Sequence, residues 1–263
     1  MPRLPGTVLA VGDGVRPIEP GDRVVTVGLD GSHAERRAVD ASFCWKVPAG
    51  VTTEQAACVP VPFGTADDAL FEFGRLQPAE TVLVHAGASG VGIAAIQLAH
   101  RAGARVLATA SGPARLGRLH ELGLDHGIDY STVDFADEVR RITEGKGADV
   151  IVDSVGGSNL QKSLQCLAYR GRCITFGDAG RELPARLDIS TMRPNNQTLV
   201  GYFLGAELFL GSRAHAVIAR HLDDIADGQL RVVIDRRFPL EEAGEAHAYI
   251  ESRQAFGRVL LIP

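Results

Sequence analysis

The sequence predicts an α/β protein that is built on a doubly wound parallel sheet and has β-rich segments near both ends of the chain. Three observations support this fold class. From about residue 65, short apolar runs alternate with longer amphipathic segments. A glycine-rich turn joins the first of these runs to the segment after it, and turn dipeptides punctuate short β-like runs before residue 47.

Composition indicates a globular protein that acts on small molecules. The 263 residues are 45% hydrophobic and 22% charged, which excludes disorder, collagen and coiled coil. The formal net charge is -5 with acids and bases interspersed, which argues against nucleic acid or a membrane as a partner. The four cysteines form no C-x-x-C pair and predict reduced thiols without a metal, and the absence of a leader pattern predicts a cytoplasmic protein.

The N-terminal part, up to about residue 47, is expected to be a small all-β piece. Its β-like runs cover residues 7–11 and 23–27, and Gly-Asp and Pro-Gly dipeptides separate them.

The central part of the chain alternates strands and helices. Apolar runs predict strands at 81–85, 105–109, 127–130, 149–153, 172–176 and 198–202. Helical patterns fall between them, at about 90–102, 113–122, 134–143 and 158–168. Six strands with intervening helices are typical of a domain that binds a dinucleotide.

The C-terminal part shows a mixed pattern after residue 201. It predicts a helix at 213–226, a strand at 231–238, a helix at 240–252 and a last strand at 258–262.

The turn after the first central strand carries the main functional signal. Small residues Gly87, Ser89, Gly90 and Gly92 stand between a strand and a helix, where the backbone must turn sharply and let phosphate oxygens reach amide groups. The pattern predicts a pyrophosphate site at the helix N-terminus. A helix that simply packs closely on a sheet is the alternative interpretation.

The end of the second central strand favours NADPH over NADH. Residues 108–112 read Ala-Thr-Ala-Ser-Gly, without the acid that would hold the ribose hydroxyls of NADH. Arg115 follows by one helical turn and Tyr130 closes the third strand, so a guanidinium and hydroxyl groups are available to a 2′-phosphate. The alternatives are a solvated cation for Arg115 and a half-buried strand aromatic for Tyr130.

Several short motifs, in a fixed order, give the chain a resemblance to a known family. The chain resembles the quinone oxidoreductase (zeta-crystallin-like) branch of the medium-chain dehydrogenase/reductase superfamily from about residue 6 to the C-terminus. Relatives start several strands earlier, so the resemblance implies an N-terminally shortened member. The motifs are Gly21-Asp22-Arg23-Val24, Val47-Pro48-Ala49-Gly50, Thr65-Ala66, the run 85–92, Ile128-Asp129-Tyr130, Asp153-Ser154-Val155-Gly156-Gly157 and the closing segment 246–260.

The resemblance implies a domain organisation and a chemistry. It implies a partial GroES-like catalytic domain at 1–63 and 201–263 and a Rossmann cofactor domain at 64–200. It also implies zinc-independent reduction of a quinone or an α,β-unsaturated carbonyl by NADPH. The Gly-His-Glu signature and the four-cysteine lobe of zinc-using relatives do not occur in the sequence. A homodimer that joins the sheets of two cofactor domains edge to edge is expected from the same resemblance.

The family's functional positions map onto this chain residue by residue. The resemblance places Thr65 near the nicotinamide as the candidate catalytic residue, although a helix N-cap is an equally weighted interpretation. It assigns the cofactor-binding positions to Gly87, Ser89, Gly90, Val91, Gly92, Ser111, Arg115, Tyr130, Val155, Phe176, Gly177 and Arg253.

Two other functions fit the same residues. An enoyl-thioester reductase uses the same hydride geometry, and an NADPH-binding protein without turnover, such as a sensor, is an alternative of another class. His85, beside that turn, is interpreted as a hydrogen-bonded histidine packed against the sheet rather than as a catalytic acid.

Overall fold

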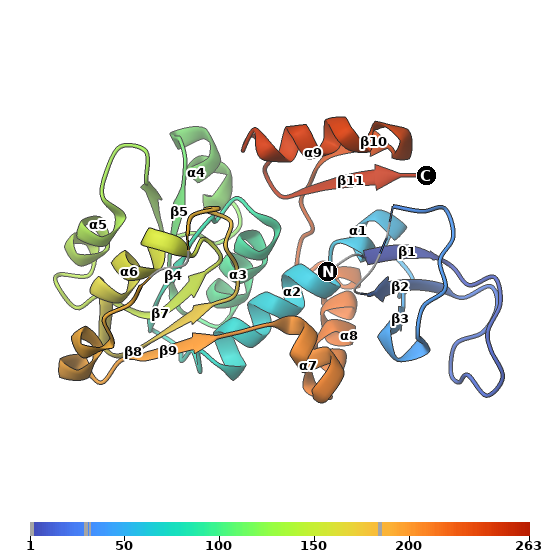
Figure 1. Cartoon of the computed structure of the whole chain (residues 1–263), viewed down its shortest axis with the longest axis horizontal. Helices are drawn as coiled ribbons and strands as arrows, with labels where there is room; N and C mark the ends of the chain where they lie inside the picture. The colour runs from blue at the N-terminus through green and yellow to red at the C-terminus, as the bar shows by residue number, and fades with distance from the viewer. Residues whose placement is uncertain (1–2, 29–30, 32, 184–185) are drawn as a thin grey trace. The chain divides into compact units, whose positions relative to one another are not determined.

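The computed structural model describes residues 3–28, 31, 33–183 and 186–263. The chain divides into two units, one made of residues 1–64 and 204–263 and the other of residues 65–203 (Figure 1). Each unit has its own sheet or sheets and its own buried side chains.

Unit 65–203 is built on a six-stranded parallel sheet with the strand order β6-β5-β4-β7-β8-β9. The central strands are nearly continuous apolar runs because helices cover both faces of a sheet of this kind. All six predicted strands are present. Their bounds are β4 Thr81–Val84, β5 Arg105–Ala110, β6 His126–Asp129, β7 Ala148–Asp153, β8 Leu167–Thr175 and β9 Thr198–Gly201.

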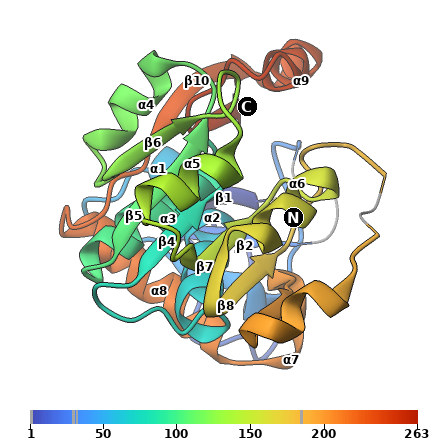
Figure 2. The same ribbon diagram turned by 90° about the vertical axis from the view of Figure 1, so that its left-hand side faces the viewer.

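Four helices connect these strands in two layers (Figure 2). Because crossovers between parallel strands are right-handed, α3 and α4 lie on one face of the sheet and α5 and α6 on the other. The core under α5 and α6 includes Leu83, Leu107, Ile151, Val139 and Leu164. The helices are α3 Gly90–Arg101, α4 Pro113–His120, α5 Phe135–Ile142 and α6 Gly157–Gln165.

The start of β8 differs from the sequence prediction. The helix expected at 158–168 ends at Gln165, and the strand expected at 172–176 begins at Leu167. Leu167 pairs with Ala148, and a register shift then separates this pairing from that of Val150 with Arg172. Buried Leu167 therefore packs as part of the sheet, where its apolar surface meets the core, and does not continue the helix.

Unit 1–64/204–263 contains two small sheets. One is antiparallel with the order β1-β2-β3, and the other is a parallel pair, β10-β11. The strand expected at 7–11 is wrong, because β1 ends at residue 7 and Leu9, beyond it, is 68% exposed. The bounds are β1 Arg3–Thr7, β2 Arg23–Val27, β3 Cys44–Lys46, β10 Ile234–Pro239 and β11 Arg258–Ile262.

Two helices near residue 60 follow the all-β piece that was expected up to about residue 47, and neither was predicted. Helix α1 (Thr53–Ala57) begins with a capping box, in which the Thr52 side chain accepts from the Gln55 N–H and the Gln55 side chain accepts from the Thr52 N–H. That Thr-x-x-Gln spacing was a usable signal in the sequence. The other helices are α2 Pro60–Asp67, α7 Leu204–Leu210, α8 Arg213–Ala226 and α9 Ala243–Glu251, with the short helices η1 Ala41–Phe43, η2 Asp68–Glu72, η3 Ile189–Asn195 and η4 Leu240–Glu242.

Helix α8 and β3 meet through an aromatic contact. The Trp45 indole N–H donates to the His215 carbonyl at 3.0 Å, and the two rings stack with centroids 5.2 Å apart. Both partners of this contact belong to the same unit, so it joins segments far apart in the sequence.

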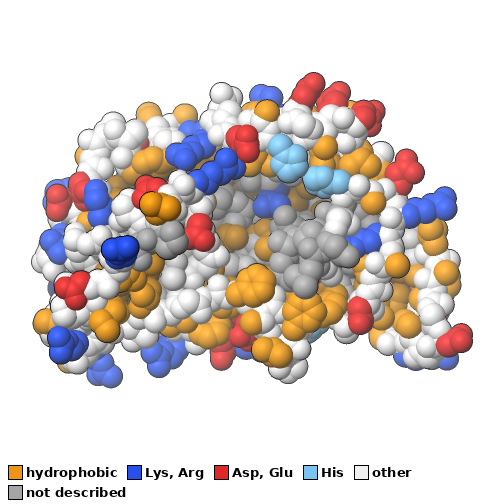
Figure 3. Space-filling model, in the orientation of Figure 1, with side chains coloured by type: hydrophobic (Ala, Val, Ile, Leu, Met, Phe, Trp, Pro, Cys, Tyr) orange, Lys and Arg blue, Asp and Glu red, His pale blue; other side chains and the backbone are white. Residues whose placement is uncertain are grey.

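The surface carries both signs of charge. On the face drawn in Figure 3, basic and acidic side chains are interspersed. Among the described residues, none of the helices is both long enough and apolar enough to cross a membrane.

Candidate functional site

The candidate site lies at the carboxyl ends of β4 and β7. From β4 the strand order runs outward through β5 and β6, and from β7 it runs the other way through β8 and β9. Ligands of open α/β sheets bind at this point, where the order reverses and the connections leave to opposite faces.

The glycine turn lies at the end of β4 and starts α3. Ser89 is the N-cap of α3, and its Oγ accepts from the Gly92 N–H at 3.0 Å. A Cβ at Gly92 would stand 2.4 Å from the Ala86 carbonyl oxygen, and one at Gly87 would stand 2.9 Å from the Ala108 Cβ. Both positions therefore require glycine. Gly87, Ser89, Gly90, Val91 and Gly92 all lie in this turn or in the first residues of α3.

The end of β5 brings a guanidinium and a hydroxyl group together. The Arg115 Nη1 donates to both the carbonyl oxygen and the Oγ of Ser111, at 3.0 Å each. Tyr130 follows β6 and is 47% exposed, and its N–H donates to the Ala110 carbonyl at 3.3 Å. Ser111 and Tyr130 thus follow the ends of the neighbouring strands β5 and β6, and Arg115 reaches Ser111 from the first turn of α4.

Ser111, Arg115 and Tyr130 form a corner at the carboxyl ends of β5 and β6. An acid that sequence reasoning missed lies beside this corner. Asp129 is the partner of Ala110 in the sheet, and its carboxylate accepts from the Ser131 hydroxyl at 2.5 Å and the Ser131 N–H at 3.0 Å. Hydrogen bonds from the Ser131 side chain and from the Gly112 N–H lower the pKa of Asp129. An acid was expected only at the end of the second strand, and the Asp-x-Ser spacing that begins at the last residue of the third strand was the available signal for this one.

A second group of predicted positions gathers at the ends of β7 and β8. The Phe176 N–H donates to the Asp153 carbonyl at 3.1 Å, and the Gly180 N–H donates to the Val155 carbonyl at 2.9 Å. A Cβ at Gly177 would stand 2.9 Å from the Ser154 carbonyl oxygen. Val155, Phe176 and Gly177 are therefore neighbours at the same edge of the sheet as the glycine turn.

His85 is buried behind the turn, on the α5/α6 face. Its Nδ1 lies 3.1 Å from the Thr109 Oγ1 and its Nε2 lies 2.9 Å from the Ser163 Oγ, while its ring meets Phe135 edge-on. Burial lowers the pKa of His85 to about 4, against a smaller opposite effect of Asp153. The histidine is neutral and hydrogen-bonded, as the sequence analysis expected, but its partners Thr109 and Ser163 could not be named from the sequence.

Two further predicted residues belong to other elements of the chain. Thr65 is 5% exposed and lies inside α2, so its interpretation as an N-cap is wrong. Arg253 belongs to the other unit, just after α9, and has a left-handed backbone with φ of 58°. Within the ranges that the structure describes, no three His, Cys, Asp or Glu side chains are grouped to hold a metal.

The chain is similar in sequence to a synaptic vesicle membrane protein and to a reductase. The human synaptic vesicle membrane protein VAT-1 homolog is 34% identical over 279 residues, which covers 98% of this chain and 69% of the relative. A 2-haloacrylate reductase of Burkholderia is 34% identical over 266 residues and covers 96% of this chain and 77% of the relative.

Solved structures share the fold over nearly the whole chain. A quinone oxidoreductase of Pseudomonas syringae has a TM-score of 0.92 at 30% identity and covers 98% of this chain and 80% of its own. A mycobacterial protein solved with NADPH has a TM-score of 0.92 at 34% identity, with coverage of 99% and 81%. The family described as zinc-binding dehydrogenase matches residues 122–261. The chain therefore belongs to this family, within the quinone oxidoreductase branch of the medium-chain dehydrogenase/reductase superfamily.

Proposed function

We propose that this protein is an NADPH-dependent oxidoreductase that transfers hydride to a quinone or an α,β-unsaturated carbonyl compound. The observation that carries the proposal is the Ser111–Arg115 pair at the end of β5, next to the glycine turn at the end of β4. A guanidinium together with a hydroxyl group suits a phosphate monoester such as the 2′-phosphate of NADPH.

The residues of the turn fit a dinucleotide. A side chain at Gly87 or Gly92 would collide with neighbouring atoms of the chain, so glycine at both positions allows the tight turn that brings the N-terminus of α3, capped by Ser89, to the end of β4. Amide groups and the helix dipole at such a terminus favour an anionic pyrophosphate. Gly87 to Gly92 would hold the pyrophosphate, and Ser111, Arg115 and Tyr130 would hold the 2′-phosphate.

The remaining predicted residues would complete the cofactor site. Val155, Phe176 and Gly177 are neighbours at the ends of β7 and β8, and we assign them contacts with the nicotinamide half, together with Thr65. Arg253 is proposed as a further cofactor contact. In this assignment residues 64–200 form the cofactor domain, and residues 1–63 and 201–263 form the catalytic domain.

The chain's part in the reaction is to bind, orient and exclude water. Bound NADPH would supply the hydride, and the enolate or phenolate oxygen left on the acceptor needs one hydrogen-bond donor, with solvent able to supply the proton. Thr65 would provide that donor or hold the carboxamide. The cluster around His85 takes no part in proton transfer because both ring nitrogens are engaged in buried hydrogen bonds.

The substrate class is supported by the names of two relatives. A quinone and a 2-haloacrylate are both conjugated electrophiles. The quinone oxidoreductase of Pseudomonas syringae shares this chain's fold, and the 2-haloacrylate reductase of Burkholderia is 34% identical to it in sequence. Because a conjugated carbonyl accepts hydride at carbon without a Lewis acid, the proposed reaction uses no metal.

A steady-state assay tests the proposal. The purified protein is mixed with NADPH and either 1,4-benzoquinone, a simple enone or a crotonyl thioester, and oxidation of the reduced nicotinamide is followed by its absorbance. We expect turnover with the quinone or the enone. Turnover with the thioester alone would replace the proposal by an enoyl-thioester reductase, and NADPH binding without turnover on any acceptor would indicate a binding protein.

A further inference from the structure

Thr109, at the end of β5, holds the beginning of the glycine turn with both its main chain and its side chain. The Gly87 N–H donates to the Thr109 carbonyl oxygen at 2.8 Å, and the Ala86 N–H donates to the Thr109 Oγ1 at 3.3 Å. Ala86 has a φ of 49°, a left-handed conformation that costs energy for a residue with a Cβ. The strained residue of the turn is thus the one that the threonine hydroxyl holds.

A buried chain of hydrogen bonds fixes the direction of that hydroxyl. The Ser163 hydroxyl donates to the Asn159 carbonyl at 2.9 Å, so its Oγ is available to accept from His85 Nε2–H. His85 Nδ1 is then an acceptor, and the Thr109 hydroxyl donates to it. The oxygen of that hydroxyl keeps its lone pairs for the Ala86 N–H. Only the neutral His85 with its proton on Nε2 satisfies every member of the chain.

Thr109 is also close in sequence to the residues proposed to hold the 2′-phosphate. Ser111, which receives the Arg115 guanidinium, stands two positions after Thr109 in the chain. One buried residue, 3% exposed, therefore links the turn proposed for the pyrophosphate to the corner proposed for the 2′-phosphate.

We propose that Thr109 is a positioning residue for the dinucleotide and that His85 acts through it by orienting its hydroxyl group. Thr109 touches no part of the cofactor in this arrangement; it sets the place of the Ala86 and Gly87 amides from which the turn begins. The inference rests on the proposed function, since it needs a dinucleotide at the glycine turn.

Three threonine variants test the proposal. Thr109→Val keeps the shape of the side chain but removes the acceptor of the Ala86 N–H, and Thr109→Ser keeps the hydroxyl. Thr143→Val is the matched control. Thr143 is also buried, donates to the Val139 carbonyl and accepts from the Gly147 N–H, but it lies at the end of α5, away from the turn.

Dissociation constants of NADPH and NADH are measured for each variant by fluorescence titration, next to its melting temperature. We expect Thr109→Val to weaken both nucleotides about tenfold and by the same factor, since one oriented hydrogen bond to the shared turn is lost. Thr109→Ser should return both constants to within about twofold of wild type, and Thr143→Val should lower the melting temperature and leave both constants unchanged. In turnover, Thr109→Val should raise KM for NADPH and leave kcat unchanged.

The outcomes distinguish a failure of the positioning role of Thr109 from a failure of the proposed function. If wild type binds NADPH and Thr109→Val binds it equally well, the positioning role is wrong while the proposed function stands. If wild type binds neither nucleotide, the proposed function fails and this inference fails with it. Should Thr109→Val not fold, His85→Leu decides, because it removes the acceptor of the Thr109 hydroxyl: about threefold weaker binding supports the role, and unchanged binding overturns it.

Discussion

The glycine turn makes the strictest demand on single residues. A Cβ at Gly92 would press on the Ala86 oxygen and on the backbone of Gly87, which stands 2.7 Å away, and neither can move without opening the turn. Gly92→Ala is therefore expected to weaken NADPH binding by about tenfold or more, the equivalent of at least one hydrogen bond.

Gly117→Ala is the control for this substitution. Gly117 lies inside α4 with open space around the position of a Cβ, so alanine there should stabilise the helix by about 0.5 kcal/mol and leave binding unchanged. Normal NADPH affinity in Gly92→Ala, measured by the same titration, would contradict the assignment of the turn.

His85 makes stability depend on pH. An unfolded histidine takes up a proton near pH 6.5, whereas burial keeps the folded His85 neutral down to about pH 4. The unfolded state therefore binds more protons between these values, and stability falls as the pH drops from 6.5 to 4, by a few kcal/mol at most. Asp153, whose Oδ1 accepts from the Val155 and Gly156 N–H groups, is the charged group that opposes this loss.

Urea unfolding at several pH values measures this dependence. In His85→Gln the amide can donate and accept without titrating, so the part of the slope between pH 6.5 and 4 that belongs to His85 should disappear. A slope in the variant equal to that of wild type would show that His85 does not stay neutral when folded.

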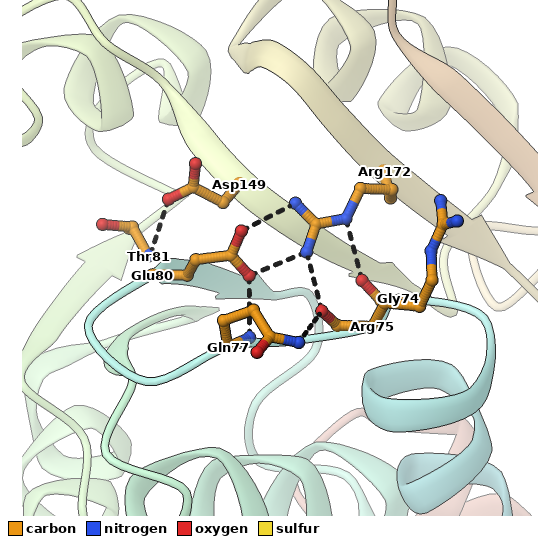
Figure 4. A network of polar contacts seen from close by, with 7 residues as sticks. All are labelled: Gly74, Arg75, Gln77, Glu80, Thr81, Asp149 and Arg172. Atoms are coloured by element: carbon orange, nitrogen blue, oxygen red, sulfur yellow. Dashed lines mark hydrogen bonds and ion pairs between the residues drawn. The ribbon is translucent and has the colours of Figure 1, made fainter.

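At the amino-terminal ends of the strands, an ion pair joins β8 to the loop that precedes β4 (Figure 4). Arg172 of β8 donates to both carboxylate oxygens of Glu80, at 2.7 Å and 3.0 Å, and to the carbonyls of Gly74 and Arg75. Partial burial raises the pKa of Glu80, but hydrogen bonds from Arg172 and the Gln77 N–H, with the charge of Arg172, outweigh it and keep the pKa below its usual 4.5. The stability this pair provides is complete above pH 4.5 and is lost as the pH falls through the lowered pKa.

Replacing Arg172 measures how much this ion pair contributes to the free energy of unfolding. Arg172→Met is expected to lower the free energy of unfolding by about 2 kcal/mol, because it leaves a half-buried carboxylate and two carbonyls without their donor. Arg141→Met is the control: Arg141 is 71% exposed, whereas Arg172 is 11% exposed, and the loss of the pair that Arg141 makes with Glu138 on the same helix should cost less than about 0.5 kcal/mol. Equal costs in denaturant unfolding would show that the Arg172 pair is no more than a surface contact.

The sequence carried enough information for most elements of the sheet unit but not for all contacts at the site. Apolar runs and the glycine turn predicted β4 and α3 to within a residue, because burial on both faces leaves a clear pattern. The start of β8 at Leu167 depends on a register shift against β7, which local pattern cannot show. Thr109, likewise, is an ordinary strand residue in sequence, and its role comes from the pairing of β4 with β5.

We expect the β9 edge of the sheet to be a surface for self-association. Strand β9 is the last in its sheet and has no partner on its outer side among the described residues, and Phe203, just after it, is 59% exposed. Open strand edges pair readily, so we expect a homodimer that joins two β9 strands.

Sedimentation velocity tests this assembly. Wild type should sediment at about twice the 27.9 kDa of one chain, and Thr198→Lys combined with Val200→Lys should shift it toward the monomer, because lysine on an edge opposes pairing. A dimer unchanged by the two lysines would place the interface elsewhere, and a monomeric wild type would contradict self-association at this edge.

Direct titration of the protein with NADPH and with NADH tests the proposed cofactor site most directly. We expect NADPH to bind at least about tenfold more tightly than NADH, as one charge-assisted contact to the 2′-phosphate would give, and Arg115→Gln to remove that preference by weakening NADPH alone. Tighter binding of NADH, or no binding of either nucleotide, would contradict the assignment of the glycine turn and the Ser111–Arg115 corner to NADPH.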